Sequence, residues 1–355
     1  MIRLNMDKHL QRIRGLDAIR FVCALWVMLD HYGVPVPFGH SADGLLKQGL
    51  YGALHLSFVG PPAVIVFFVI SGFCIHFPNR GDKTPKWIEY YSRRYLRIGV
   101  PMGCVMVISH AIPGEGLRSL GKMVLWSLYC EIVYYTVYPG LTYLKRLFGW
   151  RFLLVCTFSI AALVVALNCN DKAYADLGTL STSLLGLPCW ILGCLLAEES
   201  DMLAPVRVRG ILYWRILIWI AACVCAALRF HTPVGYVYTL DLFAILVFFW
   251  LRMEIRHNRF TPPWKYLERF GVWSYSLYLI HIPALALLGL LCGGSFPSNH
   301  LTGWLIKIFC GLFSAYIFYV VVELPSHLMA RNVKYWLHSL RRILLKEDSV
   351  DPASP

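Results

Sequence analysis

Charged residues are scarce in this sequence, and no stretch of it is polar enough to predict a soluble domain. Only 15% of the 355 residues are Asp, Glu, Lys or Arg, whereas 58% are hydrophobic and the mean hydropathy is +0.58. Soluble domains are roughly 45 to 50% apolar. Internal repeats and low-complexity blocks are also missing. The composition therefore excludes an ordinary soluble protein and predicts an integral membrane protein.

Signatures of metal sites, catalytic triads and signal peptides are missing as well. The twelve cysteines lie mostly in apolar segments, without C-x2-C pairs or histidines at metal-ligand spacing, so we interpret them as packing residues and expect no metal. No Ser/His/Asp motif supports a triad. The first apolar segment carries internal charges and precedes no small-residue cleavage site, so we expect it to remain in the mature chain.

Long apolar stretches recur along the whole chain. A helix needs about 20 such residues to cross roughly 30 Å of hydrocarbon, and most of the stretches approach this length. We therefore predict an all-α, polytopic bundle of ten transmembrane helices, at about 16–33, 52–77, 98–112, 123–142, 151–168, 179–197, 211–230, 236–252, 271–292 and 302–323.

Lys and Arg in the connecting segments predict the orientation, because positively charged loops stay on the cytoplasmic side. With the N-terminus inside, the inner segments hold Arg3, Lys8, Arg12, Arg14, Arg80, Lys83, Lys86, Arg93, Arg94, Arg97, Lys145, Arg146, Arg151, Arg207, Arg209, Arg252, Arg256, Arg259, Lys265, Arg269, Arg331, Lys334, Arg341, Arg342 and Lys346. The outer loops hold only Lys47, Arg118, Lys122, Lys172 and Arg229. This asymmetry predicts N-in, C-in topology, and it explains the net charge of +13 without a nucleic-acid partner.

The chain divides into one membrane domain, residues 1–333, and a short tail, residues 334–355. The tail begins "KYWLHSLRRILLKED", which combines basic residues with apolar ones. This pattern predicts a cytoplasmic amphipathic helix on the anionic inner leaflet of the lipid bilayer, followed by a frayed end.

The first predicted helix carries ionisable residues that a lipid-facing helix would avoid. Its sequence, "GLDAIRFVCALWVMLDHYG", contains Asp17, Arg20, Asp30 and His31. Arg20 and His31 are eleven residues apart, which is about three helical turns, so they share a face and stand about 16 Å apart. Ionisable groups within a membrane are candidates for function. The alternative is that Asp17 neutralises Arg20 at i, i+3 and His31 meets interfacial water.

A second cluster of charge lies in "WIEYYSRRYLRIGVP", on the predicted cytoplasmic side. Arg93, Arg94 and Arg97 are interleaved there with tyrosines. Guanidinium groups bind phosphate bidentately and stack on planar groups, so the cluster suits a ligand that carries phosphates and a base. The alternative is an ordinary positive-inside loop.

These segments resemble the integral-membrane acyltransferase 3 family, whose members acylate cell-envelope glycans and related acceptors with acyl-CoA. Arg20 and His31 match the family's Arg and His separated by ten residues in the first membrane helix. "FFVISGFCI", "SRRYLRIGVP", "LWSLYCEIVYY", "SYSLYLIHIP" and "VVELPS" resemble further motifs of the family, in the family's order. The resemblance covers roughly residues 13 to 326. The chain departs from the family's motifs at three positions where the family usually has other residues, namely Ile132, Leu324 and Ser326.

The resemblance implies an acyl-CoA-dependent O-acyltransferase with acyl-CoA, most simply acetyl-CoA, as co-substrate. His31 would be the general base, because a neutral imidazole is available at physiological pH. Arg20, Arg93, Arg94 and Arg97 would hold the nucleotide at the cytoplasmic mouth. Glu131, a second catalytic candidate, would orient the imidazole or hold acceptor hydroxyls. The alternative for Glu131 is a structural ion pair with Lys307 or Arg215.

Two further groups of residues are binding candidates. Ser71 and Gly72 would line the path of the pantetheine arm, although small residues in membrane helices commonly serve helix packing. Tyr275, Tyr278 and His281 share a face of the predicted ninth helix and would contact acceptor or cofactor. For His281 a purely structural role is an equal alternative.

The resemblance implies transfer of an acetyl group to a polysaccharide or a lipid-linked oligosaccharide in the bacterial cytoplasmic (inner) membrane. A succinyl group and a non-glycan acceptor stay open, and the sequence predicts no oligomeric state. A secondary transporter of a small polar solute or acyl group is the main rival. Transporters often show repeats and broken helices in matching halves, which this chain lacks in sequence. A non-catalytic glycan-binding protein is a second rival.

Overall fold

The computed structural model describes residues 13–33, 45–81, 86–113, 120–292 and 301–333, and the regular structure within these ranges is entirely helical. The predicted tail, residues 334–355, lies outside them. The long helices are α1 (Leu16–Tyr32), α2 (Leu45–Ser57), α3 (Gly60–His76), α4 (Trp87–Ala111), α6 (Trp126–Leu167), α7 (Thr179–Glu199), α8 (Ile211–His231), α9 (Tyr236–Phe260), α11 (Ser274–Leu291) and α12 (Leu301–Phe318). The shorter elements are η1 (Phe77–Asn79), η2 (Gly121–Leu125), η3 (Tyr174–Asp176), η4 (Ser200–Met202), α10 (Lys265–Gly271) and η5 (Tyr319–Glu323).

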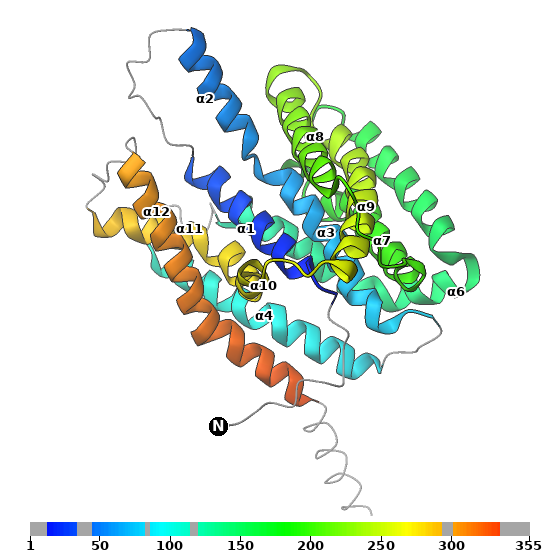
Figure 1. The fold of residues 1–355 in the computed structure, drawn as a ribbon. Helices are drawn as coiled ribbons and strands as arrows, with labels where there is room; N and C mark the ends of the chain where they lie inside the picture. The colour runs from blue at the N-terminus through cyan, green and yellow to red at the C-terminus, as the bar shows by residue number, and fades with distance from the viewer. Residues whose placement is uncertain (1–12, 34–44, 82–85, 114–119, 293–300, 334–355) are drawn as a thin grey trace, which may run out of the picture.

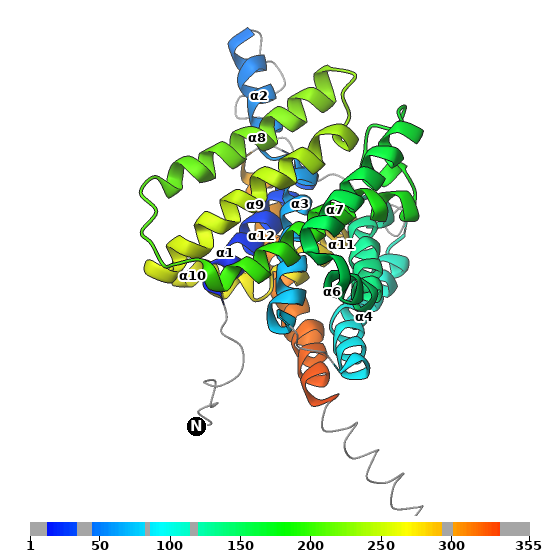
Figure 2. The same ribbon diagram turned by 90° about the vertical axis from the view of Figure 1, so that its right-hand side faces the viewer.

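Helices α1 and α3 lie in the middle of the bundle (Figures 1 and 2). Helix α1 packs against α3, α10 and α11, and α3 packs most extensively against α7. The α3–α7 contact depends on glycine: a Cβ on Gly72 would meet the carbonyl oxygen of Trp190, and a Cβ on Gly193 would meet that of Val69. Small residues let membrane helices approach backbone to backbone. The glycines therefore set the close packing of the central helices.

Contacts from neighbouring helices fix both ends of α1. At its beginning, Glu268 Oε1 of α10 accepts hydrogen bonds from the backbone N–H groups of Gly15 and Ala18, at 2.8 and 3.2 Å. This carboxylate satisfies donors that a helix N-terminus leaves unpaired. At the other end, the Tyr32 hydroxyl donates to the carbonyl oxygen of His281 at 2.8 Å, and Trp304 Nε1 donates to that of Gly33 at 2.7 Å. The residues that α1 carries are thus held in place.

The structure does not confirm the predicted number of ten membrane-spanning helices. Among the described residues, seven helical segments are long and apolar enough to cross a bilayer: Tyr51–Asn79, Met123–Leu167, Thr179–Met202, Ile211–His231, Tyr236–Phe260, Ser274–Leu291 and Leu301–Val333. The predicted segments 123–142 and 151–168 both lie in the range of α6, and the backbone breaks between them at Gly149 (φ 79°, ψ 160°), which divides this range into two helices as predicted. The predicted segments 16–33 and 98–112 form α1 and part of α4, and neither helix belongs to this set; α1, with 17 residues, is shorter than every helix in it.

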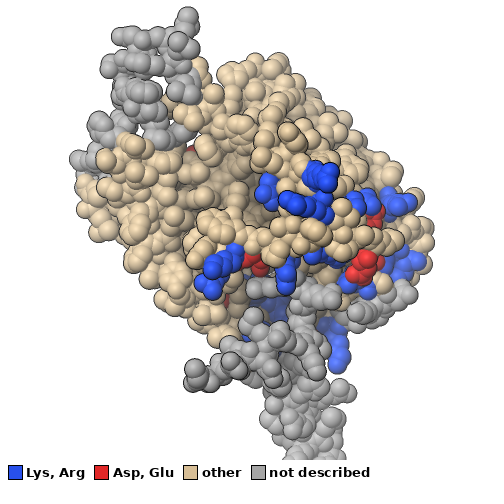
Figure 3. Space-filling model, in the orientation of Figure 1, with Lys and Arg blue, Asp and Glu red and all other residues tan. Residues whose placement is uncertain are grey.

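Lys and Arg gather toward one end of the molecule. In Figure 3 the blue side chains lie from the middle of the visible face downward, mostly on the right, while the tan surface above them shows none. The positive-inside rule would place such an end in the cytoplasm. N-in, C-in topology stays a prediction.

Candidate functional site

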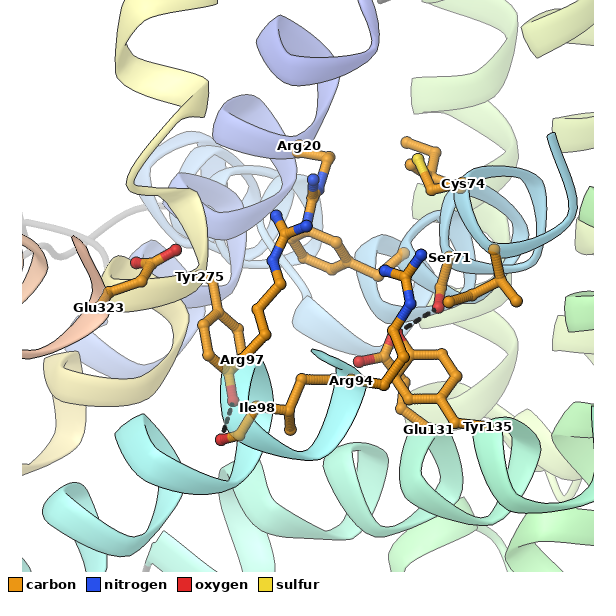
Figure 4. Close-up of a pocket in the computed structure, with 13 residues that line it drawn as sticks. Arg20, Ser71, Cys74, Arg94, Arg97, Ile98, Glu131, Tyr135, Tyr275 and Glu323 are labelled. Carbon is orange, nitrogen blue, oxygen red and sulfur yellow. Dashed lines mark hydrogen bonds between the residues drawn. The ribbon is translucent and has the colours of Figure 1, made fainter. Parts of the chain in front are cut away.

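A cavity of about 70 Å³ opens where helices α1, α3, α4, α6, α11 and the turn η5 meet (Figure 4). Most of its polar lining comes from charged side chains and hydroxyl groups. The lining consists of Arg20, Phe67, Ile70, Ser71, Cys74, Ile75, Arg94, Arg97, Ile98, Glu131, Tyr135, Tyr275 and Glu323. Several separate segments of the chain thus contribute to one polar site between apolar helices.

Three guanidinium groups face this cavity. Arg94 and Arg97 are three residues apart on α4 and so share one face of the helix, while Arg20 projects from α1. Figure 4 shows the guanidinium groups of Arg20 and Arg97 beside each other and that of Arg94 pointing into the same space. Arg93 does not join them: it pairs with Glu89 at 2.6 Å, and 44% of its side chain is exposed. The structure therefore places three of the four predicted cofactor arginines together, and Arg93 is not among the residues that line this cavity.

Two carboxylates balance part of this charge. Glu131 of α6 lines the cavity, as does Glu323 at the end of η5. Glu323 accepts hydrogen bonds from the backbone N–H and the hydroxyl of Ser276, and the side chain of Glu323 is only 2% exposed. Sequence reasoning did not assign Glu323 a role. The available signal was a lone carboxylate in the apolar run "IFYVVVELP".

One nitrogen of His327 lies close to both Glu323 and Arg97 of the arginine cluster. Arg97 Nε donates to His327 Nε2 at 3.1 Å, and the same nitrogen of His327 lies 3.4 Å from Glu323 Oε1. With three arginines and two carboxylates, the cavity keeps a formal excess of positive charge. It therefore suits an anionic group, which guanidinium donors bind well.

The hydroxyl groups of Ser71 and Tyr135 form one wall of the cavity. They lie 3.0 Å apart, and Trp190 Nε1 donates to Ser71 Oγ at 3.3 Å. Tyr135 is a second lining residue that sequence reasoning missed. Gly72, predicted beside Ser71 on the cofactor path, turns instead toward Trp190 of α7. The packing alternative holds for Gly72, because a one-residue step on a helix changes the face.

The predicted acceptor face of α11 separates into different environments. Tyr275 lines the cavity, and its hydroxyl donates to the carbonyl oxygen of Ile98 at 3.1 Å. The hydroxyl of Tyr278 instead meets Ser127 Oγ at 2.7 Å. Phe67 lines the cavity and packs edge-on against Tyr278, with ring centroids 5.6 Å apart. On α11, Tyr278 lies between Tyr275, which lines the cavity, and His281.

His31 contacts His281 across the α1–α11 interface. His31 Nδ1 and His281 Nε2 are 2.8 Å apart, and the two ring planes are parallel within 5°. His281 is completely buried. The side chain that contacts the His31 ring is thus that of His281, while Glu131 lines the cavity. Sequence spacing could not reveal the pair, because its members are 250 residues apart.

The other two ionisable residues of α1 have structural contacts. Asp17 lies 3.7 Å from Arg20, as the alternative interpretation of α1 expected. Asp30 Oδ2 accepts from the backbone N–H of Gly60 at 2.9 Å, at the beginning of α3. A carboxylate is favourable at a helix N-terminus. Asp17 and Asp30 therefore hold neighbouring groups, while Arg20 and His31 face the cavity and α11.

The proposed ion pair between Glu131 and Arg215 or Lys307 is wrong for Arg215. Arg215 binds Glu254 of α9 with two hydrogen bonds, from Nε at 2.7 Å and from a terminal nitrogen at 3.0 Å. Lys307 belongs to α12 and is not among the residues that line the cavity with Glu131. Glu131 lies instead with the arginines of α1 and α4.

Comparison with known proteins identifies the family. The profile of the acyltransferase domain that defines the acyltransferase 3 family matches residues 13–323. The chain is also similar to the acyltransferase MdmB of Streptomyces mycarofaciens, with 23% identity over 331 aligned residues that cover 81% of this chain and 83% of the relative. No solved structure matches the chain. Because the family profile spans most of the sequence, this chain belongs to the acyltransferase 3 family and is a membrane acyltransferase.

Proposed function

We propose that this protein moves an acyl group, most simply acetyl, from cytoplasmic acyl-CoA to a hydroxyl of an envelope polysaccharide or a lipid-linked glycan. His31 is the general base of this reaction. The arginine-lined cavity is the observation that carries the proposal, since one helix links it to the histidine pair. Arg20 faces the cavity, and His31 stands about 16 Å further along α1.

The charge of the cavity matches the anionic end of acyl-CoA. The nucleotide carries about four negative charges and would cross lipid only at high cost, so it stays at the cytoplasmic mouth. Arg20, Arg94 and Arg97 supply fixed guanidinium donors to a phosphate there. Glu131 and Glu323 reduce the repulsion among the three arginines, and the cavity still keeps a formal net positive charge.

The size of the cavity limits what enters it. A bound water occupies about 10 to 15 Å³ by this measure of volume, so 70 Å³ admits a single phosphate or a slim chain but no nucleotide base. We infer that the pantetheine arm passes this point and continues along α1 toward His31. Phe67 and Tyr278 lie on that route, so their ring contact opens when the arm enters.

The reaction itself balances without another reagent. The acceptor oxygen attacks the thioester carbonyl while its proton moves to His31, forming the new C–O and N–H bonds. The C–S bond then breaks, and the proton on His31 passes to the departing sulfur to give the free thiol of CoA. The acceptor approaches from the outer side of the bacterial cytoplasmic membrane.

The decisive experiment compares His31→Ala and Arg20→Ala with the native chain. Membranes that contain equal amounts of each protein receive radiolabelled acetyl-CoA, and label in envelope glycan is measured. We expect transfer to vanish in His31→Ala, because the proton acceptor is gone. We expect excess acetyl-CoA to restore part of the transfer in Arg20→Ala, because only affinity is reduced. Native transfer by His31→Ala would contradict the mechanism.

A further inference from the structure

The hydrogen bonds of His281 have a fixed direction. Its Nδ1 lies 3.0 Å from the carbonyl oxygen of Leu277, one turn earlier on α11. A carbonyl oxygen accepts hydrogen bonds and donates none. Nδ1 of His281 therefore carries a hydrogen.

Burial determines whether the other nitrogen of that ring, Nε2, carries a hydrogen. His281 is completely buried between α1 and α11, where a charged imidazole would be costly, so the ring is neutral and has one N–H. Its Nε2 consequently carries a lone pair and accepts. The partner at 2.8 Å, Nδ1 of His31, must then donate. This leaves the lone pair of His31 on Nε2.

We propose that His281 is a positioning residue that holds His31 in the tautomer whose Nε2 accepts the acceptor's proton. This inference rests on the proposed function, in which His31 is the base. It assigns His281 a specific task instead of the substrate contact that the sequence predicted. Tyr32 supports the arrangement, since its hydroxyl donates to the backbone carbonyl of His281 and joins the same two helices.

The neutral partner has a chemical consequence. In serine hydrolases the histidine is oriented by a carboxylate, which also stabilises the imidazolium that forms. A neutral imidazole orients the ring without adding a negative charge beside it. His31 therefore releases its proton readily to the departing thiolate, which an acyl transfer from a thioester needs in its second half.

The test separates tautomer control from packing. Protein in lipid nanodiscs is given acetyl-CoA, and release of the CoA thiol is followed with water or envelope glycan of the expression host as acceptor. Four proteins are compared: native, His281→Ala, and each of these with Nδ-methylhistidine incorporated at position 31. The methyl group blocks Nδ1 and leaves the lone pair of residue 31 permanently on Nε2. Binding of acetyl-CoA and the thermal unfolding midpoint are measured in parallel.

We expect His281→Ala to lower kcat about 10- to 100-fold, the usual effect of removing a group that orients a functional histidine, while KM for acetyl-CoA stays unchanged. Nδ-methylhistidine at position 31 should restore most of kcat in the His281→Ala background, where the missing ring leaves space for the methyl group. A merely structural role of His281 predicts no such rescue.

Four outcomes overturn the proposal or separate it from the function on which it rests. Native kcat in His281→Ala, or no rescue by Nδ-methylhistidine in a folded protein that binds acetyl-CoA, overturns the positioning role. If His281→Ala does not fold, His281→Gln is compared with His281→Leu. The side-chain oxygen of Gln can accept the hydrogen bond from His31 and Leu cannot, so only His281→Gln should retain activity. Equal activity of the two variants contradicts the proposal. Thiol release by His31→Ala would show that the proposed function itself fails.

Discussion

Arg20 and His31 stand on one helix, yet each meets a different partner helix. Arg20 faces the cavity that it shares with Arg94 and Arg97 of α4, while His31 Nδ1 lies 2.8 Å from His281 Nε2 of α11. Helix α1 thus connects an arginine-lined cavity to a pair of histidines.

Replacement of a cavity arginine should weaken binding of acetyl-CoA, whereas replacement of its exposed neighbour should not. Hydrogen bonds to charged groups contribute about 1.5 to 3 kcal/mol, so Arg97→Ala should raise KM for acetyl-CoA about tenfold or more. Arg93→Ala is the matched control on the same helix, because Arg93 pairs with Glu89 at the surface. The comparison is made by acyl-transfer kinetics. An equal rise of KM in both variants would contradict the assignment of the cavity.

Loss of the Glu323 carboxylate should reduce stability as well as activity. Glu323→Ala leaves the buried N–H of Ser276 without its acceptor and removes a counter-charge of Arg97. A buried unsatisfied polar group costs about 1 to 3 kcal/mol, so the thermal unfolding midpoint in detergent should fall. Ser276→Ala, which keeps the carboxylate, should have a smaller effect. An unchanged midpoint in Glu323→Ala would show that Glu323 is dispensable for the fold.

Gly72 should be irreplaceable for packing. Gly72→Ala brings a Cβ against the carbonyl oxygen of Trp190, so it should lower the yield of folded protein and its unfolding midpoint. Gly140→Ala in α6 is the control, since a Cβ there meets nothing within 4 Å and alanine favours a helix by up to about 1 kcal/mol. A stable Gly72→Ala protein with a raised KM for acetyl-CoA would instead support the predicted cofactor path.

The ion pair between Arg215 and Glu254 should stabilise the fold without affecting catalysis. The Glu254 side chain is 2% exposed and that of Arg215 is 50% exposed. Removing one partner of a buried pair costs about 3 to 5 kcal/mol, and the exposure of Arg215 reduces this to about 1 to 3 kcal/mol for Arg215→Ala. The unfolding midpoint should fall, and Glu254→Gln in addition should recover part of the loss. A specific loss of kcat would contradict this structural role.

The orientation of the chain can be tested with reporters placed in loops. We expect a reporter near Arg207 to be cytoplasmic and one near Lys172 to be external, because α7 and α8 each separate one loop from the next. Alkaline phosphatase and green fluorescent protein fusions report the two sides. The reverse pattern would overturn N-in, C-in topology and the direction of the proposed reaction.

The apolar pattern predicted most helices closely, and its failures have physical causes. The predicted segments 179–197 and 211–230 correspond to α7 (Thr179–Glu199) and α8 (Ile211–His231). These helices form from local apolar composition and backbone hydrogen bonds, which sequence displays directly. The break of α6 at Gly149 likewise lies between the predicted segments 123–142 and 151–168, whereas the predicted segment 98–112 covers only part of α4 (Trp87–Ala111).

The sequence by itself determined that Arg20 and His31 share a face of α1, because helical periodicity is local. It also determined that α4 presents Arg94 and Arg97 together, since they are three residues apart. Only the tertiary structure decided that Arg93 points away, that Glu323 joins the cavity and that His281 meets His31. These contacts join residues that lie up to 250 positions apart. They depend on which helices pack together and on how far each helix is shifted along its neighbour. The spacing of residues within one helix predicts neither.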